Sequence, residues 1–320
     1  MGIYGVENRM LSNELGDWLA VHFGLPCPVA CRLLRSYTND VYEVTCRDER
    51  YALKVYGPGW RTASEIQYEI ALLRHVSARG LAVANPLPGS DNAFVQQLPC
   101  SGAARCAVLF EWATGEKPQP PFGLPLYRAF GQAIGNLHEL SKDFTTPHHR
   151  PPLDIAPILD APVAQVLPLL EKPKDQAFLA DLARRVRERL TVFAAHGLDW
   201  GPIHGDATLD NLHVTADQTI ILYDFDSGGP GWRAADLQGW TWDDAEYRAR
   251  GEAFHDGYTR IRPLKEVDLA AAPYLTLAWD LWGLKVDLDN HILSQGAERT
   301  RKYLTDRLAA LHTRHVVDTR

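Results

Sequence analysis

The sequence lacks the features of a membrane, secreted or zinc-scaffold protein. No apolar run approaches the roughly 18 residues of a membrane-spanning helix, and the opening residues, MGIYGVENRM, lack a signal-peptide pattern. The five cysteines all lie in the first third of the chain and form no CxxC pair. Their odd number and spacing predict neither a disulfide framework nor a zinc site. We therefore expect a cytoplasmic protein with reduced cysteines and no membrane association.

An excess of positive charge is also missing. The chain has 33 Lys and Arg against 40 Asp and Glu, a formal net charge of −7. Nucleic-acid-binding proteins present a basic stripe or patch, so we expect no nucleic-acid partner. The hydrophobic share, 46%, is that of an ordinary globular protein. With 320 residues the chain is long enough for two compact lobes, and its oligomeric state stays open.

The first third of the chain predicts a helix followed by an antiparallel meander. Apolar residues recur at helical spacing over residues 11–23. Three runs rich in β-branched, aromatic or alternating apolar residues follow, separated by polar breaks that suit tight turns. The predicted strands are Ala30–Tyr37, Asp40–Cys46 and Arg50–Tyr56.

A second helix and two more strands complete this part of the chain. Thr62 and Glu65 have the spacing of a capping box, in which the hydroxyl and the carboxylate satisfy backbone amides reciprocally, and Gly80 ends the helix. Further strands are expected at Ala93–Leu98 and Arg105–Trp112. The prediction is a five-stranded antiparallel sheet with one helix beside it.

Helices dominate the remainder, so the fold class is α+β with two lobes. The polar connector Glu111–Lys117 marks the expected boundary, with an N-lobe at 1–112 and a C-lobe at 113–320. The helices predicted in the C-lobe are Leu126–Lys142, about 158–195, and several after Trp232.

One segment interrupts these helices and carries carboxylates and an amide at fixed spacing. It reads IHGDATLDN from Ile203 to Asn211, and a predicted strand pair then ends in LYDFD at residues 222–226. Phosphoryl transfer needs a carboxylate that orients the attacking hydroxyl and oxygen ligands that hold Mg²⁺ against the phosphates. The spacing H-x-D-x-x-x-x-N and the following aspartate therefore indicate Asp206 as the catalytic carboxylate, with Asn211 and Asp224 as Mg²⁺ ligands.

Taken singly, each of these residues has a structural interpretation. An aspartate or asparagine in a loop is commonly a turn or cap residue, but the whole ordered set favours chemistry. We expect His204 to hold the loop backbone rather than to transfer protons. Asp210 and Asp226 are expected to be structural, although Asp226 could reach a second metal ion.

Residues for the ATP phosphates are expected in the first lobe. Lys54 lies in the strand YALKVY, and Glu69 on the following helix is placed to pair with it, with Glu65 as the alternative. No G-x-G-x-x-G loop precedes Lys54; the turn there reads SYTND. Hydroxyls and turn amides also bind phosphate oxygens, so Ser36 is a candidate nucleotide contact, with a simple hairpin turn as the alternative.

These motifs resemble those of the aminoglycoside phosphotransferase and choline kinase-like superfamily. HGDATLDN at 204–211 is similar to its HGDxxxxN motif, DFD at 224–226 is similar to its second aspartate motif, and the resemblance runs through nearly the whole chain. It implies a protein-kinase-like fold, the use of ATP and Mg²⁺, and an Asp236 that braces the catalytic loop. Within the superfamily, SYTNDVY at 36–42 and KVYGP at 54–58 are similar to the stress-response kinase A group, whose members are protein serine/threonine kinases.

The hydroxyl acceptor is less well defined. It is a small molecule, such as an aminoglycoside or another metabolite, or a serine or threonine in a peptide. Aromatic and acidic side chains of the C-lobe could cradle a cationic acceptor, although helical spacing favours a core position for Trp279 and Trp282. The candidates are Trp240, Trp242, Asp243, Asp244, Glu246, Trp279, Asp280 and Trp282.

Two hypotheses from different classes follow. The first is an ATP-dependent hydroxyl kinase, with GTP as an open alternative because backbone groups of the connector would read the base. The second is a nucleotide-binding pseudokinase that acts as a scaffold. A scaffold has no chemical need for Lys54, Asp206, Asn211 and Asp224 together, so the complete set favours the enzyme.

Overall fold

In the computed structural model the chain is described at residues 12–237 and 245–317, and it divides into two compact units. The lobe boundary predicted between residues 112 and 113 stays a prediction. The first unit draws on three segments that are distant in sequence, and the second takes up the rest. Unit one comprises Met1–Pro118, Asp143–Arg150 and Thr208–Asp226, and unit two comprises Gln119–Lys142, Pro151–Ala207 and Ser227–Arg320.

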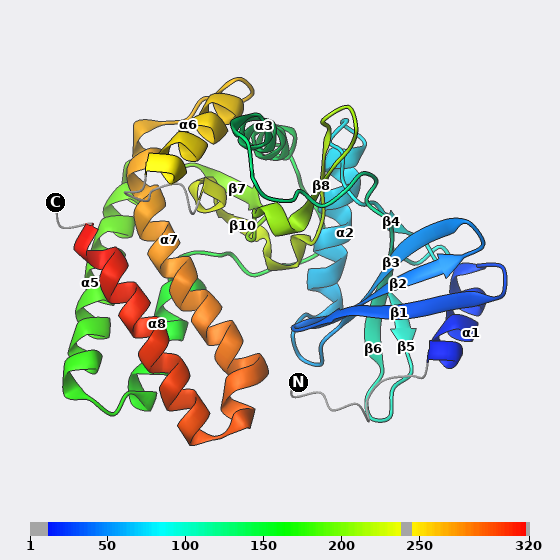
Figure 1. Ribbon diagram of the computed structural model, residues 1–320, viewed down its shortest axis with the longest axis horizontal. Coiled ribbons are helices and arrows are strands. Elements are labelled where there is room, and N and C mark those ends of the chain that lie inside the picture. The colour runs from blue at the N-terminus through cyan, green and yellow to red at the C-terminus, as the bar shows by residue number, and fades with distance from the viewer. Residues whose placement is uncertain (1–11, 238–244, 318–320) are drawn as a thin grey trace. The chain divides into compact units, whose positions relative to one another are not determined.

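The first unit is built on an antiparallel sheet (Figure 1), which has six strands within the described residues. The sheet order is β1-β2-β3-β6-β4, with β5 also paired to β6. The predicted number of five was wrong, because the two residues of β4 are too few to show any alternation. The strands are β1 (Val29–Ser36), β2 (Asn39–Cys46), β3 (Glu49–Tyr56), β4 (Pro86–Leu87), β5 (Gln96–Leu98) and β6 (Arg105–Glu111).

Two helices pack beside this sheet. Helix α1 (Ser12–Phe23) contacts β1 and buries Leu15 and Leu19 in the core of the first unit. Helix α2 (Ala63–Ser77) begins with the predicted capping box: the Thr62 hydroxyl accepts from the Glu65 amide, and the Glu65 carboxylate accepts from the Thr62 amide. The box fixes the start of the helix that carries Glu69.

The predicted strand pair near the motifs is present and belongs to the first unit. Strand β8 (Leu212–Val214) pairs antiparallel with β9 (Ile220–Leu222). The amide of Ala84 donates to the carbonyl of Leu222 at 3.0 Å, and Glu116 and Val214 exchange backbone hydrogen bonds. These bonds bring residues 211–224 into the same unit as the large sheet.

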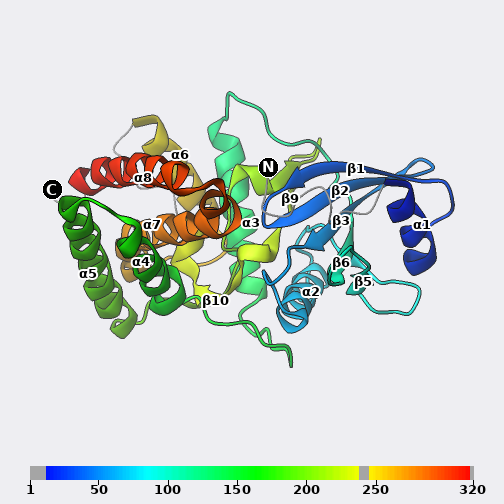
Figure 2. The ribbon, with the colours of Figure 1, turned by 90° about the horizontal axis from the view of Figure 1, so that it is seen from below.

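The second unit is mainly helical. Helices α3 (Leu124–Leu140) and α6 (Ala245–Thr259) pack closely, as do α5 (Pro173–Ala195) and α7 (Glu266–Asp287) (Figure 2). The helix predicted at 158–195 is interrupted, because the chain is extended at Leu170 before Pro173 opens α5. The described part of this unit also contains the α-helices α4 (Ala161–Val166) and α8 (Ala297–Val317).

A short strand pair that the sequence did not predict supports the HGD segment. Strand β7 (Trp200–Ile203) pairs antiparallel with β10 (Gly229–Trp232). Both strands contain glycine and proline, which are depleted in strands, so no alternating pattern marked them.

Among the described helices, none combines the length and the apolarity that crossing a bilayer requires.

Candidate active site

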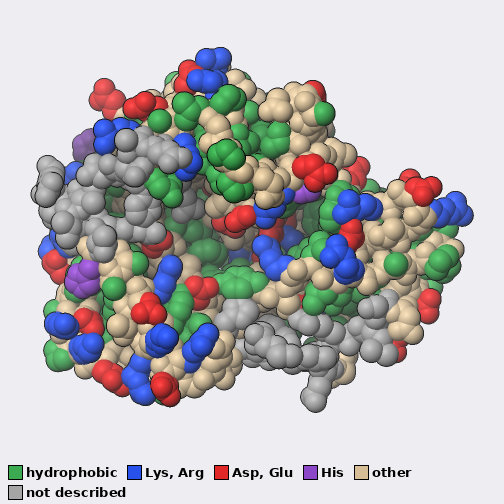
Figure 3. Space-filling model, in the orientation of Figure 1, with side chains coloured by type: hydrophobic (Ala, Val, Ile, Leu, Met, Phe, Trp, Pro, Cys, Tyr) green, Lys and Arg blue, Asp and Glu red, His purple; other side chains and the backbone are tan. Residues whose placement is uncertain are grey.

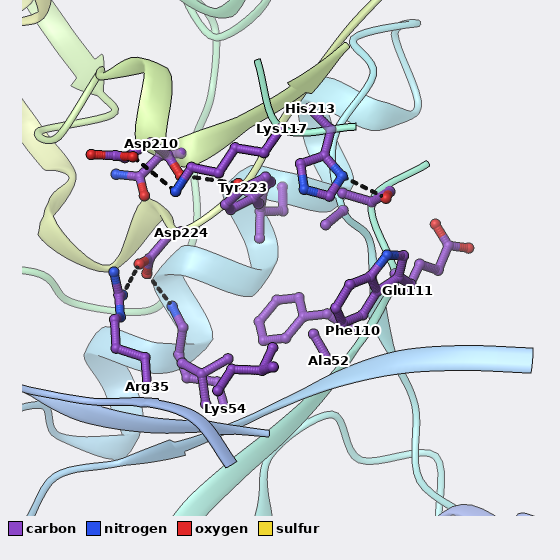
Figure 4. Close-up of a pocket in the computed structure, with 17 residues that line it drawn as sticks. Arg35, Ala52, Lys54, Phe110, Glu111, Lys117, Asp210, His213, Tyr223 and Asp224 are labelled. Atoms are coloured by element: carbon purple, nitrogen blue, oxygen red, sulfur yellow. Dashed lines mark hydrogen bonds and ion pairs between the residues drawn. The ribbon is translucent and has the colours of Figure 1, made fainter. Parts of the chain in front are cut away.

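A cavity of about 240 Å³ lies within the first unit. It brings together the sheet, the connector after β6, and the segment that carries Asn211 and Asp224 (Figure 4). Arg35 and Lys54 lie beside Asp224, whereas Glu111 lies away from it (Figure 4). The lining residues are Leu34, Arg35, Val41, Ala52, Lys54, Leu73, Ala84, Phe110, Glu111, Trp112, Ala113, Lys117, Asp210, Asn211, His213, Tyr223 and Asp224.

Lys54 lies between two carboxylates. Its ammonium donates to Glu69 Oε1 at 3.0 Å, so the predicted pairing is present, and it lies 3.0 Å from Asp224 Oδ1. The Tyr56 hydroxyl donates to the other oxygen of Glu69 at 3.0 Å. Burial opposes the charge of Lys54, but Asp224 and Glu69 raise its pKa well above the usual value, so Lys54 is a fixed cation.

Asp224 faces two cations. Its Oδ2 accepts from the Arg35 guanidinium at 2.6 Å while Oδ1 faces Lys54. Burial would raise its pKa, yet Lys54 and Arg35 together hold that pKa far below the ordinary value. The backbone of Asp224 has a φ of 63°, in the left-handed region that non-glycine residues rarely adopt. Such strain is frequently found at functional sites.

Asn211 is the second predicted metal ligand and lines the same cavity. It is buried at the end of a 3₁₀ turn, where its carbonyl accepts from the Tyr223 amide at 3.1 Å. A carboxylate and an amide oxygen are the hard donors that Mg²⁺ takes alongside substrate phosphates and water. The donor set of Asn211 and Asp224 therefore fits Mg²⁺. Their role as ligands stays a prediction.

The Asp226 carboxylate forms hydrogen bonds and an ion pair with neighbouring side chains. Its Oδ2 accepts from Asn39 at 2.8 Å and from the Trp60 indole at 2.5 Å, and Arg61 lies 3.4 Å from Oδ1. Arg150 donates to its backbone carbonyl. Burial raises the pKa of Asp226, but the cations around it, Lys54 first, lower it overall. These contacts agree with the structural interpretation of Asp226.

Asp206 lies in the second unit, on a loop held by Asp236. The Asp236 carboxylate accepts from the amides of His204 at 2.7 Å and Gly205 at 2.8 Å. His204 accepts the Asp206 amide on its own Nδ1 at 3.3 Å, which is the loop-holding position expected of it. Gly205 has a φ of 77°, and a Cβ there would overlap the Ser227 carbonyl. The catalytic role of Asp206 stays a prediction.

A histidine and a tyrosine extend this network. His138 on α3 contacts Asp236 through Nε2 and the Tyr258 hydroxyl through Nδ1, each at 2.9 Å. His138 and Asp236 are both fully buried. The sequence indicated the bracing role of Asp236 through resemblance alone. It gave no signal for His138 or Tyr258, which lie on distant helices.

The structure places Ser36 at the end of β1, paired with Asp40, and outside the cavity lining. Its neighbour Arg35 lines the cavity instead. Asp210 forms an exposed ion pair with Lys117 at 2.8 Å. Sequence reasoning therefore missed Arg35 and Lys117. Strand alternation would not have identified Arg35, because the register of β1 shifts between Leu33 and Arg35 and the adjacent residues Leu34 and Arg35 both line the cavity.

The connector after β6 forms one wall of the cavity. His213 on β8 pairs through Nδ1 with the Ala113 carbonyl at 2.8 Å, and its ring contacts Tyr223 and Trp112 edge-on. A carbonyl only accepts, so Nδ1 carries the proton. The aromatic and apolar lining suits a flat heterocycle.

The acceptor candidates divide into two groups. Trp240, Trp242, Asp243 and Asp244 lie outside the described residues, as does the side chain of Glu246. Trp279 is 5% exposed and packs edge-on against Trp282 with ring centroids 4.9 Å apart. Trp279 is thus a core residue, as helical spacing favoured, whereas Trp282 is partly exposed.

The family model described as "Phosphotransferase enzyme family" matches residues 30–264. The chain belongs to this family. It is similar to an uncharacterized protein of Deinococcus radiodurans, 38% identical over 87% of this chain and 82% of that one. It is also 29% identical to a homoserine kinase of Methylobacterium radiotolerans over 74% of this chain and 73% of the relative. The prediction of a phosphotransferase is therefore confirmed.

Solved structures confirm the kinase-like α+β fold. A microcompartment-associated aminopropanol kinase matches with a TM-score of 0.73 at 22% identity, over 92% of this chain and 95% of that one. The amicoumacin kinase hAmiN, solved with AMP-PNP and Ca²⁺, matches with a TM-score of 0.72 at 20% identity, over 93% of each chain. The narrower resemblance to the stress-response kinase A group stays a prediction.

Proposed function

We propose that this protein transfers the γ-phosphoryl group of ATP, with Mg²⁺, to the hydroxyl of a small molecule that bears an amine. The observation that carries the proposal is that Lys54, Asn211 and Asp224 line one cavity of a phosphotransferase-family chain, with Glu69 paired to Lys54. Lys54 is held as a cation by its two carboxylates and would bind the phosphates. An ATP-dependent kinase needs an ATP-containing compartment, so the cytoplasm is the proposed location.

Each charged residue has a distinct task in this proposal. Asn211 and Asp224 would hold Mg²⁺, which when bound neutralises charge on the phosphates. Glu69 fixes the position of Lys54, and the apolar wall from Phe110 to Ala113 would bind the base.

Asp206 would orient the acceptor hydroxyl and take its proton. The hydroxyl oxygen forms a bond to the γ-phosphorus as the bond from that phosphorus to the oxygen of ADP breaks. The network of Asp236, His204 and His138 holds the backbone around Asp206 in place. Because this loop is braced before substrate binds, little reorganisation is needed during the reaction.

The acceptor class rests on the relatives and on charge. Homoserine and aminopropanol, named in the relatives' descriptions, are both small alcohols that carry an amine. The net charge of −7 favours the approach of a cationic acceptor over that of an anionic one. On the face drawn in Figure 3, basic and acidic side chains are interspersed, which does not suggest a docking surface for a highly charged polymer. A peptide hydroxyl is the second candidate, favoured by the N-lobe resemblance.

An acceptor screen tests the proposal. ATP consumption would be followed with amino alcohols, with hydroxylated metabolites that lack an amine, and with serine/threonine peptides. We expect turnover with amino alcohols, and loss of that turnover in Asp206→Asn. Turnover with peptides alone would show that the acceptor is a peptide hydroxyl and not an amino alcohol. Tight Mg·ATP binding with no turnover in any set would favour the scaffold.

A further inference from the structure

Asp224 contacts two cations that differ in burial. Lys54 is 7% exposed and anchored a second time by Glu69. Arg35 is 52% exposed and lies on β1, an edge strand of the sheet. In Figure 4 both side chains point at the Asp224 carboxylate. Of the two cations, Arg35 is the more exposed.

The position of Arg35 competes with the proposed metal. Its guanidinium lies 2.6 Å from Asp224 Oδ2, and Lys54 already faces the other oxygen. A divalent ion at Asp224 would meet two positive charges within a few ångströms, and repulsion between like charges at that range is large when they are partly buried. A divalent ion at Asp224 therefore competes with these two cations for the carboxylate.

We propose that Arg35 is a mobile counter-ion. It pairs with Asp224 as the structure shows, and it moves from the carboxylate to the phosphate tail when Mg·ATP enters. This inference rests on the proposed function and adds a phosphate-binding residue that the sequence motifs did not indicate. An arginine suits both positions, because its planar fork pairs with carboxylates and with phosphates.

The proposal predicts opposite effects on two affinities. In Arg35→Ala, binding of Mn²⁺ alone, measured by electron paramagnetic resonance, should tighten because a competitor is gone. Binding of Mg·ATP, measured by calorimetry, should weaken because a phosphate contact is lost. Each change should be about fivefold, the size expected for a half-exposed ion pair. Arg35→Lys keeps the charge and should recover part of the Mg·ATP affinity.

Arg32→Ala is the matched control. Arg32 lies on the same strand and is more exposed, but its guanidinium pairs with Glu43 rather than with a cavity residue. Both affinities should stay at the wild-type value in this variant. Thermal unfolding of both variants would show that the fold is intact.

The outcomes separate the two proposals. If the wild-type protein binds no Mg·ATP, the proposed function fails and this inference fails with it. If the wild-type protein binds Mg·ATP but Arg35→Ala behaves like Arg32→Ala, the function stands and the mobile counter-ion is rejected. Weaker Mn²⁺ binding in Arg35→Ala would also reject it, because Arg35 would then assist the metal instead of competing with it.

Discussion

At the scale of single residues, the main feature of the candidate site is a set of buried charges. Glu69 and Lys54 are almost fully buried, a position that charged side chains occupy only when they are paired. The sequence predicted their pairing from a strand lysine and a glutamate on the next helix. It did not predict that Lys54 also contacts Asp224, because that contact spans 170 residues of chain and depends on tertiary structure.

Replacing Asp206 with Asn tests the proposed base. The amide keeps the size of the side chain but cannot take a proton, so turnover should fall by about 10² or more. The fold and the affinity for Mg·ATP should be unchanged. Steady-state kinetics and calorimetry on the same preparation measure both quantities, and near-normal turnover would exclude Asp206 as the base.

Lys54→Met tests the buried pair. Glu69, 1% exposed, would lose its cation, so the free energy of unfolding should fall by about 3 kcal/mol. The double variant Lys54→Met/Glu69→Leu removes both charges and should recover part of this loss. Urea unfolding of the wild type and both variants gives the comparison. Equal stability of the single and double variants would contradict this argument, because the unpaired charge of Glu69 would then have no cost.

At the scale of elements, periodic segments could be predicted and short ones could not. The capping box predicted helix α2, and alternating apolar residues with turn residues between them predicted strands β1 to β3. Strand β4 has two residues, and β7 and β10 contain glycine and proline. These strands are therefore recognised only by their pairing with other strands in the folded structure. Contacts between helices could not be predicted from the single sequence either, because they depend on which helix faces pack together in the folded protein.

The close packing of α3 on α6 yields a test with a control. A Cβ at Gly131 on α3 would overlap the Phe254 carbonyl, whereas a Cβ at Gly283 on α7 would meet nothing within 4 Å. Gly131→Ala should destabilise the protein by roughly 1–3 kcal/mol. Gly283→Ala should stabilise it by about 0.5–1 kcal/mol through the better helix propensity of alanine. Chemical denaturation measures both, and equal effects at the two sites would refute the packing argument.

The network under the HGD loop predicts a pH dependence of stability. Burial lowers the pKa of His138 more than Asp236 raises it, and the pKa of Asp236 is lowered, against its own burial, by His138 and the loop amides. The folded state therefore keeps both groups deprotonated. The unfolded chain takes up a proton on histidine below about pH 6.5, so stability should fall as the pH falls through that range.

His138→Gln provides the comparison for this dependence. Glutamine keeps a hydrogen-bond donor but does not titrate, so the variant should lose less stability than the wild type between about pH 7.5 and about pH 5.5. The free energy of unfolding, measured in urea at both pH values, gives the two differences. Equal differences would show that His138 does not contribute to the pH dependence.

At the scale of the whole molecule, the sequence predicted the phosphotransferase family and the α+β kinase-like fold. The roles of Asp206, Asn211 and Asp224 in the reaction stay predictions. The units are assembled from distant segments: residues 208–226 join the sheet, while Asp206 stays in the helical unit. Nothing local in HGDATLDN marks that division, and Arg35 became visible only through its contact with Asp224.

The central claim is that this family member moves a phosphoryl group from ATP to an alcohol by means of Asp206. Phosphorus NMR of a reaction with Mg·ATP and the best amino-alcohol acceptor tests it most directly. The account predicts a phosphate-ester signal that grows as the γ-phosphate signal of ATP disappears, and no such signal in Asp206→Asn. Release of inorganic phosphate alone, or an ester formed at an equal rate by the variant, would contradict the account.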